Sequence, residues 1–303
     1  MTGFTDADVA DQSGKCFIVT GANTGLGFEA ARVLAANGGR VLLACRSKEK
    51  AEAAMALIGR ETPGADLGFL PLDQADIASV RAAAKLAGRE PRLDVLLNNA
   101  GVMFPPLTRT AQGFELQFGV NHLGCFALTS LLLPKLAETR GSRIVITASL
   151  AHTRGNLEWD DLNAERRYNR TKRYSDSKLA NLLFLFELNR RLRAAGSPIT
   201  ALACHPGVAA TELMRHAGPF RAAVPLVGLL LNTAAKGAWP ALQAASAPDV
   251  QGGEYYGPQG LGEMRGHSGK AWRTRMSRDP DLARRLWDVS AQMTGIDPGL
   301  PPG

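Results

Sequence analysis

The stretch CFIVTGANTGLG, residues 16–27, decides the fold, because an apolar run passes through three glycines straight into a segment with helical periodicity. Its first five residues are apolar and β-branched types that favour a buried strand. Glycines at 21, 25 and 27 let the backbone turn tightly and adopt conformations that other residues rarely reach. The stretch predicts a strand, a glycine turn and a helix near 25–37.

The same alternation of short apolar runs and longer helical patterns continues to about residue 207. Runs that are apolar throughout are typical of parallel strands buried on both faces of a sheet. Strands that alternate with helices form a doubly wound α/β sheet. We predict this fold as a single domain of Rossmann type, with strands at 16–20, 40–45, 67–72, 93–99, 142–149 and 199–207, and helices near 25–37, 48–59, 76–88, 173–195 and, as a pair, 110–138.

Composition and charge exclude several classes of protein. The chain of 303 residues has 45% hydrophobic and 21% charged residues, the balance of a soluble globular protein. Its net charge of +7 comes mostly from scattered arginines without interleaved aromatic residues, so we expect no nucleic-acid binding. The four cysteines are widely spaced without a C-x-x-C pair, which favours reduced core thiols in the cytoplasm and no metal site.

The N-terminal stretch MTGFTDADVADQSGK is polar and acidic, so it is not typical of a signal peptide. The longest apolar run, AAVPLVGLLL from Ala222, is too short to cross a bilayer. The sequence therefore predicts no transmembrane segment.

The glycine turn also has the composition of a phosphate site. A G-x-x-x-G-x-G turn that opens a helix lets the backbone approach a pyrophosphate, whose charge the helix N-terminus stabilises. Many strand-to-helix turns carry glycine for packing alone, but the position directly after a buried strand favours dinucleotide binding. The turn therefore predicts a dinucleotide cofactor, with contacts at Gly21, Asn23, Thr24, Gly25, Leu26 and Gly27.

The end of the second strand reads VLLACRSKEK and indicates which dinucleotide binds. NAD enzymes generally carry Asp or Glu there, about 20 residues beyond the glycine turn, to bind the adenosine 2′-hydroxyl. Cys45 holds that position, and the guanidinium of Arg46 can bind a 2′-phosphate through two charge-assisted hydrogen bonds. We predict NADP(H); the alternative is that Arg46 stacks on the adenine and both cofactors bind.

The segment RYSDSKLANLLFLFEL, from Arg173, begins what we expect to be a long helix. Tyr174 and Lys178, four residues apart, share one face of it. A solvated first turn would explain an isolated pair of this kind. In hydride transfer to a carbonyl, however, a positioned acid must supply a proton to the oxygen. A free phenol has a pKa near 10, and a neighbouring ammonium group favours its ionised form.

The order of the motifs resembles the classical short-chain dehydrogenase/reductases. The motifs are TGANTGLG, NNAG at 98–101, Asn121, ITAS ending at Ser149, YSDSK and HPGVAAT, and the resemblance covers about residues 14–293. A finer similarity to the retinol-dehydrogenase-like branch comes from ACRS, NHLGCFALT, SLAH, HPGV, RRLWDVSAQMTG and the long segment between Ser149 and Tyr174. The branch does not fix the substrate.

The resemblance implies a catalytic group of Asn121, Ser149, Tyr174 and Lys178. Tyr174 would be the general acid/base, Lys178 would also bind the nicotinamide ribose, and Asn121 would hold a water that links Lys178 to solvent. Ser149, at the carboxyl edge of the sheet, would donate to the substrate oxygen; the alternative is a serine that satisfies a loop backbone group.

The resemblance also implies further cofactor contacts. Asp73 would lie near the adenine amine, with Gln74 beside it, although Asp73 could equally cap the next helix. His205 lies at a strand end without the Cys or carboxylate residues that would complete a metal site, so we interpret it as a structural residue. The other implied contacts are Asn98, Ala100 and Gly101 at the adenosine ribose, and Pro206, Gly207, Val208 and Thr211 at the nicotinamide and phosphates.

These inferences give a domain plan. We expect a polar leader at 1–13, a dinucleotide-binding catalytic domain at 14–293 and a flexible tail at 294–303. The apolar segment at about 212–232 contains Pro219, Pro225 and Gly228, which suits a lid over a lipophilic substrate or a membrane-peripheral element. A plain packed helix is the alternative.

The function predicted is an NADP(H)-dependent oxidoreductase that interconverts a lipophilic alcohol with its aldehyde or ketone. A carbon–carbon double-bond reductase of the protochlorophyllide-reductase type shares the Tyr and Lys, and a non-enzymatic NADP-binding sensor or scaffold would share the fold. The intact Asn, Ser, Tyr and Lys set favours an enzyme. Family members commonly pair through the helices expected here near 122–138 and 173–195, and the apolar run LLFLFEL in the second favours a homodimer.

Overall fold

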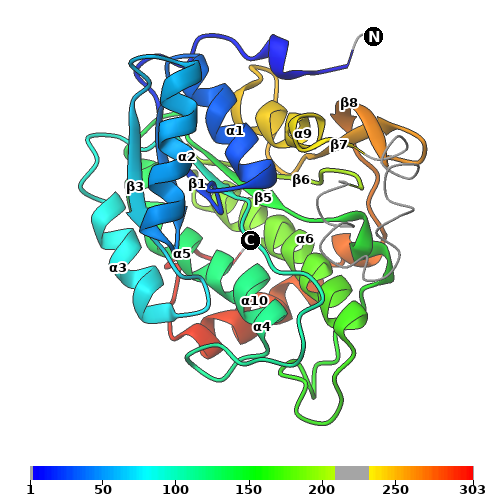
Figure 1. The fold of residues 1–303 in the computed structure, drawn as a ribbon. Coiled ribbons are helices and arrows are strands. Elements are labelled where there is room, and N and C mark those ends of the chain that lie inside the picture. Colours follow the sequence, from blue (N-terminus) through cyan, green and yellow to red (C-terminus); the bar gives the residue numbers. More distant parts are fainter. Residues whose placement is uncertain (1–2, 209–231, 303) are drawn as a thin grey trace.

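The computed structural model describes residues 3–208 and 232–302 and has one eight-stranded sheet between two layers of helices (Figure 1). The strand order is β3-β2-β1-β4-β5-β6-β7-β8. Neighbouring strands are parallel except for β8, which runs antiparallel to β7. This arrangement confirms the predicted Rossmann-type, doubly wound α/β fold.

The elements follow the predicted alternation. The strands are β1 Cys16–Thr20, β2 Arg40–Cys45, β3 Leu67–Pro71, β4 Val95–Asn98, β5 Arg143–Thr147, β6 Thr200–Cys204, β7 Tyr255–Gly260 and β8 Arg265–Lys270. The α-helices are α1 Gly25–Ala36, α2 Lys48–Glu61, α3 Ile77–Ala87, α4 Leu116–Phe118, α5 Gly124–Ala137, α6 Arg170–Ala194, α9 Ala234–Ser246 and α10 Pro280–Thr294.

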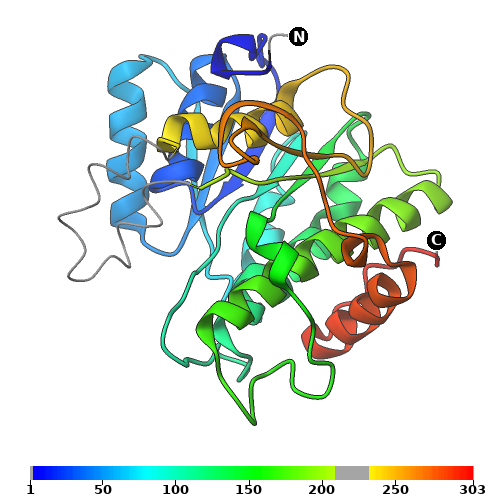
Figure 2. The same ribbon diagram turned by 90° about the vertical axis from the view of Figure 1, so that its right-hand side faces the viewer.

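Both faces of the sheet are buried, which explains why its central strands carry no polar alternation. In β1, Cys16 and Ile18 belong to the core under α3, α5, α6 and α10, whereas Phe17 and Val19 belong to the core under α1, α2 and α9. Figure 2 shows α9, in yellow, on the opposite side of the sheet from α10, in red. Apolar residues at every position are therefore what this strand requires.

Some elements differ from the sequence prediction. The strand expected at 93–99 is limited to Val95–Asn98. The first helix expected within 110–138 shrinks to the single turn α4, followed by a π-helical turn at Gly119–Leu123. Apart from the lid at about 212–232, no element was predicted after residue 207, so α9, α10 and the β7–β8 hairpin were missed. Gly and Pro interrupt the hairpin strands, YYGPQG and RGHSGK, which removes the apolar alternation that marks a strand.

The ends of the described chain lie against the domain. In the predicted leader, Phe4 forms a β-bridge with Ser268, and Val9 is buried. In the predicted tail, Ile296 is buried and the carbonyl of Leu300 accepts a hydrogen bond from Arg191. The predicted lid lies outside the described residues except for Asn232.

One described stretch, Leu116–Ala137, has the length and apolar composition of a membrane span, but 89% of its apolar window is buried inside the protein. Its core position beside α6 explains its composition. It is weak support for a membrane span, because the core helix of a soluble protein passes the same test.

Candidate active site

The turn between β1 and α1 requires its glycines. Gly21 and Gly25 have φ values of +67° and +60°, in the left-handed region that favours glycine. A Cβ on Gly27 would lie 2.6 Å from the Gly21 carbonyl oxygen and 2.5 Å from Asn99 Nδ2. Glycine therefore lets the first turn of α1 pack directly on the loop, with its N-terminus at the carboxyl edge of the sheet.

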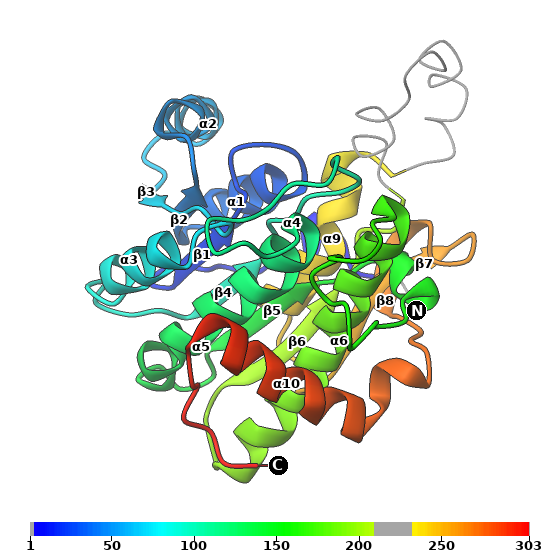
Figure 3. The same ribbon diagram turned by 90° about the horizontal axis from the view of Figure 1, so that it is seen from below.

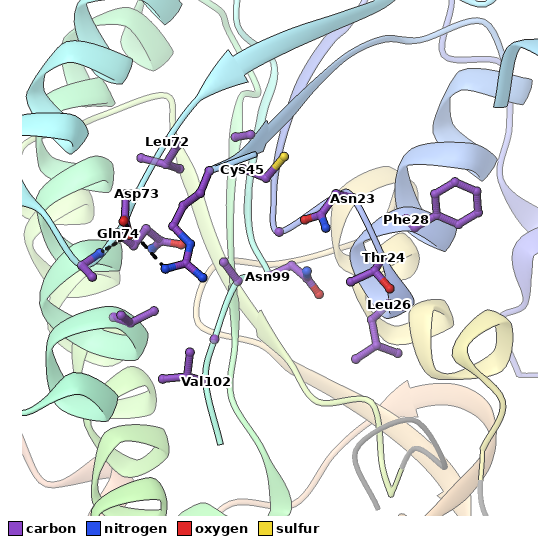
Figure 4. Close-up of a pocket in the computed structure, with 18 of the residues that line it drawn as sticks. Asn23, Thr24, Leu26, Phe28, Cys45, Leu72, Asp73, Gln74, Asn99 and Val102 are labelled. Carbon is purple, nitrogen blue, oxygen red and sulfur yellow. Dashed lines mark hydrogen bonds and ion pairs between the residues drawn. The ribbon is translucent and has the colours of Figure 1, made fainter. Parts of the chain in front are cut away.

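A cleft of about 1100 Å³ opens at this edge (Figure 4). Ten of the predicted cofactor residues line it: Gly21, Asn23, Thr24, Gly25, Leu26, Arg46, Asp73, Gln74, Ala100 and Gly101. The other lining residues are Phe28, Glu29, Ala44, Cys45, Leu72, Ala75, Asn99, Val102, Leu116, Val120 and Ala234. A cleft of this size, beside a glycine turn, fits a dinucleotide.

Several other predicted contacts do not line this cleft. Asn98 is buried and donates from Nδ2 to Thr129 Oγ1 at 3.0 Å, so its side chain is directed toward α5. The segment after β6 is bonded to the β7–β8 hairpin, because the Val208 amide donates to the Met264 carbonyl at 3.0 Å. Pro206 and Gly207 precede it, and Thr211 lies outside the described residues.

Asn99 was not among the predicted cofactor contacts, but it lines the cleft next to Ala100. Its side chain donates to the Thr20 carbonyl at 2.9 Å and so holds the β4 loop against the glycine turn. A signal was available, because successive residues at the end of a strand alternate in direction. If one Asn of the NNAG motif is directed toward α5, the next is directed away from it.

The end of the cleft next to β2, where the adenosine of a dinucleotide was predicted, contains Arg46 and no acidic residue at the end of β2. Arg46 has a side chain that is 74% exposed, and its Nη1 lies 3.9 Å from Asp73 Oδ2. Asp73 does not cap α3; Asp76 does, by accepting from the Ala78 amide. Since the Arg46 ion pair is exposed and long, it is weak, and the guanidinium can reorient toward an anion.

Tyr174 and Lys178 lie in the interior of α6 and are only 5% and 4% exposed, which excludes the solvated first turn. Lys178 Nζ donates to the Thr147 carbonyl at 3.1 Å and lies 5.7 Å from the centre of the Tyr174 ring. Phe104 packs edge-on against the same ring, with centroids 5.3 Å apart. The phenol and the ammonium group thus share one buried face of the helix.

Asn121 occupies the π-helical turn and connects two segments of the site. Its Oδ1 accepts from the Val102 amide at 2.7 Å, and its Nδ2 lies 3.0 Å from both the Val102 carbonyl and Ser177 Oγ. π-Helical turns frequently occur at functional sites. Here the turn directs an amide inward, so that it holds the β4 loop against α6.

Ser149 follows β5 and begins a 3₁₀ turn, Leu150–Arg154. Its Oγ accepts from the Ala151 amide at 3.2 Å, which is the backbone-capping role considered as an alternative. That bond uses a lone pair and leaves the hydroxyl proton available to donate. The Ser149 carbonyl accepts from His152 Nδ1 at 2.7 Å, so the histidine holds the serine backbone in place.

Gly101 joins this group to the cleft. A Cβ on Gly101 would lie 3.1 Å from Asn121 Oδ1 and 3.5 Å from Lys178 Nζ, and Gly101 itself lines the cleft. None of the four predicted catalytic residues belongs to the cleft lining itself. Asn121 and Lys178, with the Tyr174 ring next to Lys178, form a group that adjoins the cleft at Gly101.

His205 and the four cysteines have structural roles. His205 accepts from the Gly207 amide at Nδ1, and its Nε2 lies 3.1 Å from Glu263 Oε2, as expected for a structural histidine. All four cysteines are free and buried. Burial raises the pKa of Cys125 and of Cys204 to about 12, so both thiols stay protonated at neutral pH.

Comparisons with known proteins agree with this geometry. The family model described as short chain dehydrogenase matches residues 15–221. Retinol dehydrogenase 13 of Homo sapiens is 44% identical over 98% of this chain and 89% of its own length, and retinol dehydrogenase 11 of Homo sapiens is 42% identical over 93% and 86%.

Two solved structures show the same fold. An uncharacterized protein from Mycobacterium Paratuberculosis superposes with a TM-score of 0.81 at 40% identity, over 98% of this chain and 99% of that one. A blue fluorescent protein from a metagenomic library, in complex with NADPH, gives 0.63 at 26% identity, over 81% and 96%. The chain belongs to the short chain dehydrogenase family, and within it is similar to the retinol dehydrogenases, as the motif order predicted.

Proposed function

We propose that the protein is an NADP(H)-dependent oxidoreductase that interconverts a lipophilic alcohol with its aldehyde or ketone. Family membership supports an oxidoreductase that acts on alcohols with a nicotinamide cofactor. The observation that carries the finer proposal is the group of Tyr174, Lys178 and Asn121 that adjoins the dinucleotide-sized cleft at Gly101.

The chain's own groups would move and hold the proton. When bound, the cofactor supplies or accepts the hydride. In carbonyl reduction Tyr174 donates a proton to the substrate oxygen, and the Ser149 hydroxyl donates a hydrogen bond to the same oxygen. The buried cation of Lys178 stabilises the phenolate that remains. Asn121 holds the β4 loop, so that the cleft and the proton donor keep their relative positions.

The residues of the cleft fit NADP(H). The glycine turn admits a close backbone approach by a pyrophosphate, and the N-terminus of α1 favours its charge. Cys45, where NAD enzymes carry an acid, brings no negative charge to the adenosine ribose, and the exposed Arg46 offers a cation to a 2′-phosphate. The NADPH complex of a structural neighbour agrees with this choice.

Two observations support a lipophilic substrate. Relatives that are 44% and 42% identical are named retinol dehydrogenases, and retinol is an apolar alcohol. Three large apolar residues around β8 are exposed: Leu261 at 51%, Trp272 at 59%, and Met264, whose carbonyl accepts from the Val208 amide after β6, at 40%. These exposed residues support peripheral membrane contact of the protein, which we propose to be cytoplasmic, and co-sedimentation with lipid vesicles would test that contact.

A panel of alcohols, aldehydes and enones, followed by NADPH absorbance at fixed protein concentration, tests the proposal. We expect turnover of apolar alcohols and of the matching aldehydes and ketones. In an enone we expect reduction of the carbonyl group and not of the carbon–carbon double bond. Reduction of the double bond alone would instead indicate a double-bond reductase. NADPH binding without turnover of any substrate would indicate a sensor or scaffold.

A further inference from the structure

Three side chains near Ser149 carry buried polar atoms without a hydrogen-bond partner in the described part of the chain. They are Nε2 of His152, Oη of Tyr255 and Nη1 of Arg273. His152 lies in the turn after β5, Tyr255 begins β7 and Arg273 follows β8. Unpaired buried polar atoms destabilise a fold, and three in one place point to a group that would complete them.

His152 and Tyr255 are in contact, and Arg273 is near enough to both for its charge to act on them. The rings of His152 and Tyr255 meet edge to face, with centroids 5.8 Å apart, and the centroids of the Trp272 and His152 rings are 6.5 Å apart. The Glu263 carboxylate links two neighbouring residues: one oxygen lies 3.1 Å from His205 Nε2, and the other accepts from the Trp272 amide at 2.7 Å. Both Glu263 oxygens are therefore engaged, and neither pairs with Arg273.

The contacts define what each unpaired atom can do. His152 Nδ1 lies 2.7 Å from the Ser149 carbonyl, which can only accept, so Nδ1 carries the proton and Nε2 is an acceptor. Burial lowers the pKa of His152, which keeps the ring neutral at physiological pH. Burial raises the pKa of Tyr255, so its phenol keeps a proton to donate. The guanidinium of Arg273 can only donate.

The cluster also lies beside the proposed reaction centre. His152 is bonded to the backbone of Ser149, whose hydroxyl would hold the reacting oxygen. Tyr255 is near enough to Tyr174 for the two phenols to interact electrostatically. Trp272, 59% exposed, adds an apolar surface next to the polar atoms.

We propose that His152, Tyr255 and Arg273 form a second polar subsite, which binds a hydroxyl group of the substrate other than the one that reacts. A hydroxyl oxygen accepts from two donors, and its proton goes to one acceptor, which matches the phenol, the guanidinium and the imidazole. The inference rests on the proposed function and refines its substrate class to lipophilic diols and hydroxyketones. A site built to bond a hydroxyl discriminates strongly against an analogue that lacks it.

The test compares 1-alkanols with the α,ω-diols of the same chain length, from butyl to dodecyl, oxidised with NADP⁺. A diol has two equivalent ends, so a ratio of two in kcat/KM is expected from statistics alone. We expect a further gain of about tenfold or more at the chain length that spans both sites. Tyr255→Phe keeps the ring and removes only the donor, so the gain should vanish while the alkanol rate is kept.

Tyr256→Phe is the matched control. Tyr256 is the next residue of β7, packs in the core on the other face of the sheet and donates to Glu254, so its variant should keep the diol preference. If Tyr255→Phe does not fold, His152→Asn keeps a donor toward the Ser149 carbonyl and removes the Nε2 acceptor. It should abolish the same preference.

A ratio of two at every chain length, or an unchanged preference in a folded Tyr255→Phe variant, would overturn the subsite. Failure of the proposed function gives a different result, since then neither alkanols nor diols are oxidised. In that case ligand binding tests the subsite without turnover: with NADP⁺ present, a diol should raise the Tm of the parent more than the matched alkanol does. Equal shifts would also overturn the subsite.

Discussion

The catalytic and adenosine ends of the candidate site are built differently. At the catalytic end, Tyr174 and Lys178 are 5% and 4% exposed, and Asn121 is fixed by bonds to the β4 loop and to α6. At the adenosine end, the Arg46 side chain is 74% exposed and held by one ion pair of 3.9 Å. Buried groups with several bonds keep one geometry, whereas an exposed guanidinium adapts to its ligand. Substitutions at the first end should therefore change the rate, and at the second only the cofactor preference.

The largest effect is expected at Tyr174. Replacing Tyr174 by Phe keeps the ring against Phe104 and removes the acid, so kcat should fall by about 10²- to 10⁴-fold while NADPH binding survives. Turnover by NADPH absorbance and binding by fluorescence titration measure the two quantities. Tyr256→Phe serves as the control, because this hydroxyl is bonded to Glu254. A Phe variant that reduces a good carbonyl substrate at the parent rate would show that Tyr174 is not the acid.

The next effect separates two roles of Ser149. If its hydroxyl donates to the substrate oxygen, Ser149→Ala should lower kcat by about 10²- to 10³-fold. The same change removes the cap on the Ala151 amide and should cost about 1 kcal/mol of stability. Ser149→Thr, which keeps a hydroxyl, should restore much of the activity. An alanine variant with normal kcat and a lowered Tm would show that Ser149 only caps the Ala151 amide and does not bind the substrate oxygen.

A smaller effect, on stability, is expected at the glycine turn. A Cβ on Gly27 would meet the Gly21 carbonyl oxygen at 2.6 Å, so Gly27→Ala should destabilise the fold by about 1–3 kcal/mol and weaken cofactor binding. Gly59 in α2 is the control, because a Cβ there meets nothing within 4 Å. Gly59→Ala should stabilise the protein by about 0.5–1 kcal/mol. Equal unfolding free energies for the two variants would contradict the packing argument.

The glycine turn, the apolar strands and the position of α6 could be predicted because each depends on local sequence. The course of the chain after residue 207 could not. Strand β7 pairs with β6 through only a short register and contains Gly257 and Pro258, so its strand character comes from its neighbours. The His152–Tyr255 contact joins residues about a hundred positions apart, and no motif in the sequence marks it.

Helix α10, which was not predicted, weakens the reason to expect a homodimer. The apolar run LLFLFEL was the reason to expect a homodimer, but α10 lies beside α6 (Figure 3). Trp287 of α10 packs on Phe126 and Phe184, with ring centroids 5.4 and 5.9 Å apart. Part of the apolar surplus of α6 is thus covered within the same chain. The homodimer stays a prediction, and sedimentation at micromolar concentration tests it, since a species of 32.3 kDa alone would exclude it.

The smallest effect is expected at Arg46. The parent should prefer NADPH to NADH, because the guanidinium can bind the 2′-phosphate and no carboxylate at the end of β2 binds a 2′-hydroxyl. A hydrogen bond to a charged group contributes about 1.5–3 kcal/mol, and solvent screens it at this exposed position, so Arg46→Ala should lower the NADPH/NADH ratio of kcat/KM by about tenfold. The rate at saturating NADPH should not change, since Arg46 lies at the adenosine end of the cleft. Raising the ionic strength should weaken NADPH binding to the parent more than to the variant. A parent that prefers NADH, or an alanine variant with the parent ratio, would remove Arg46 as the phosphate-binding residue and favour stacking on the adenine, which needs no phosphate.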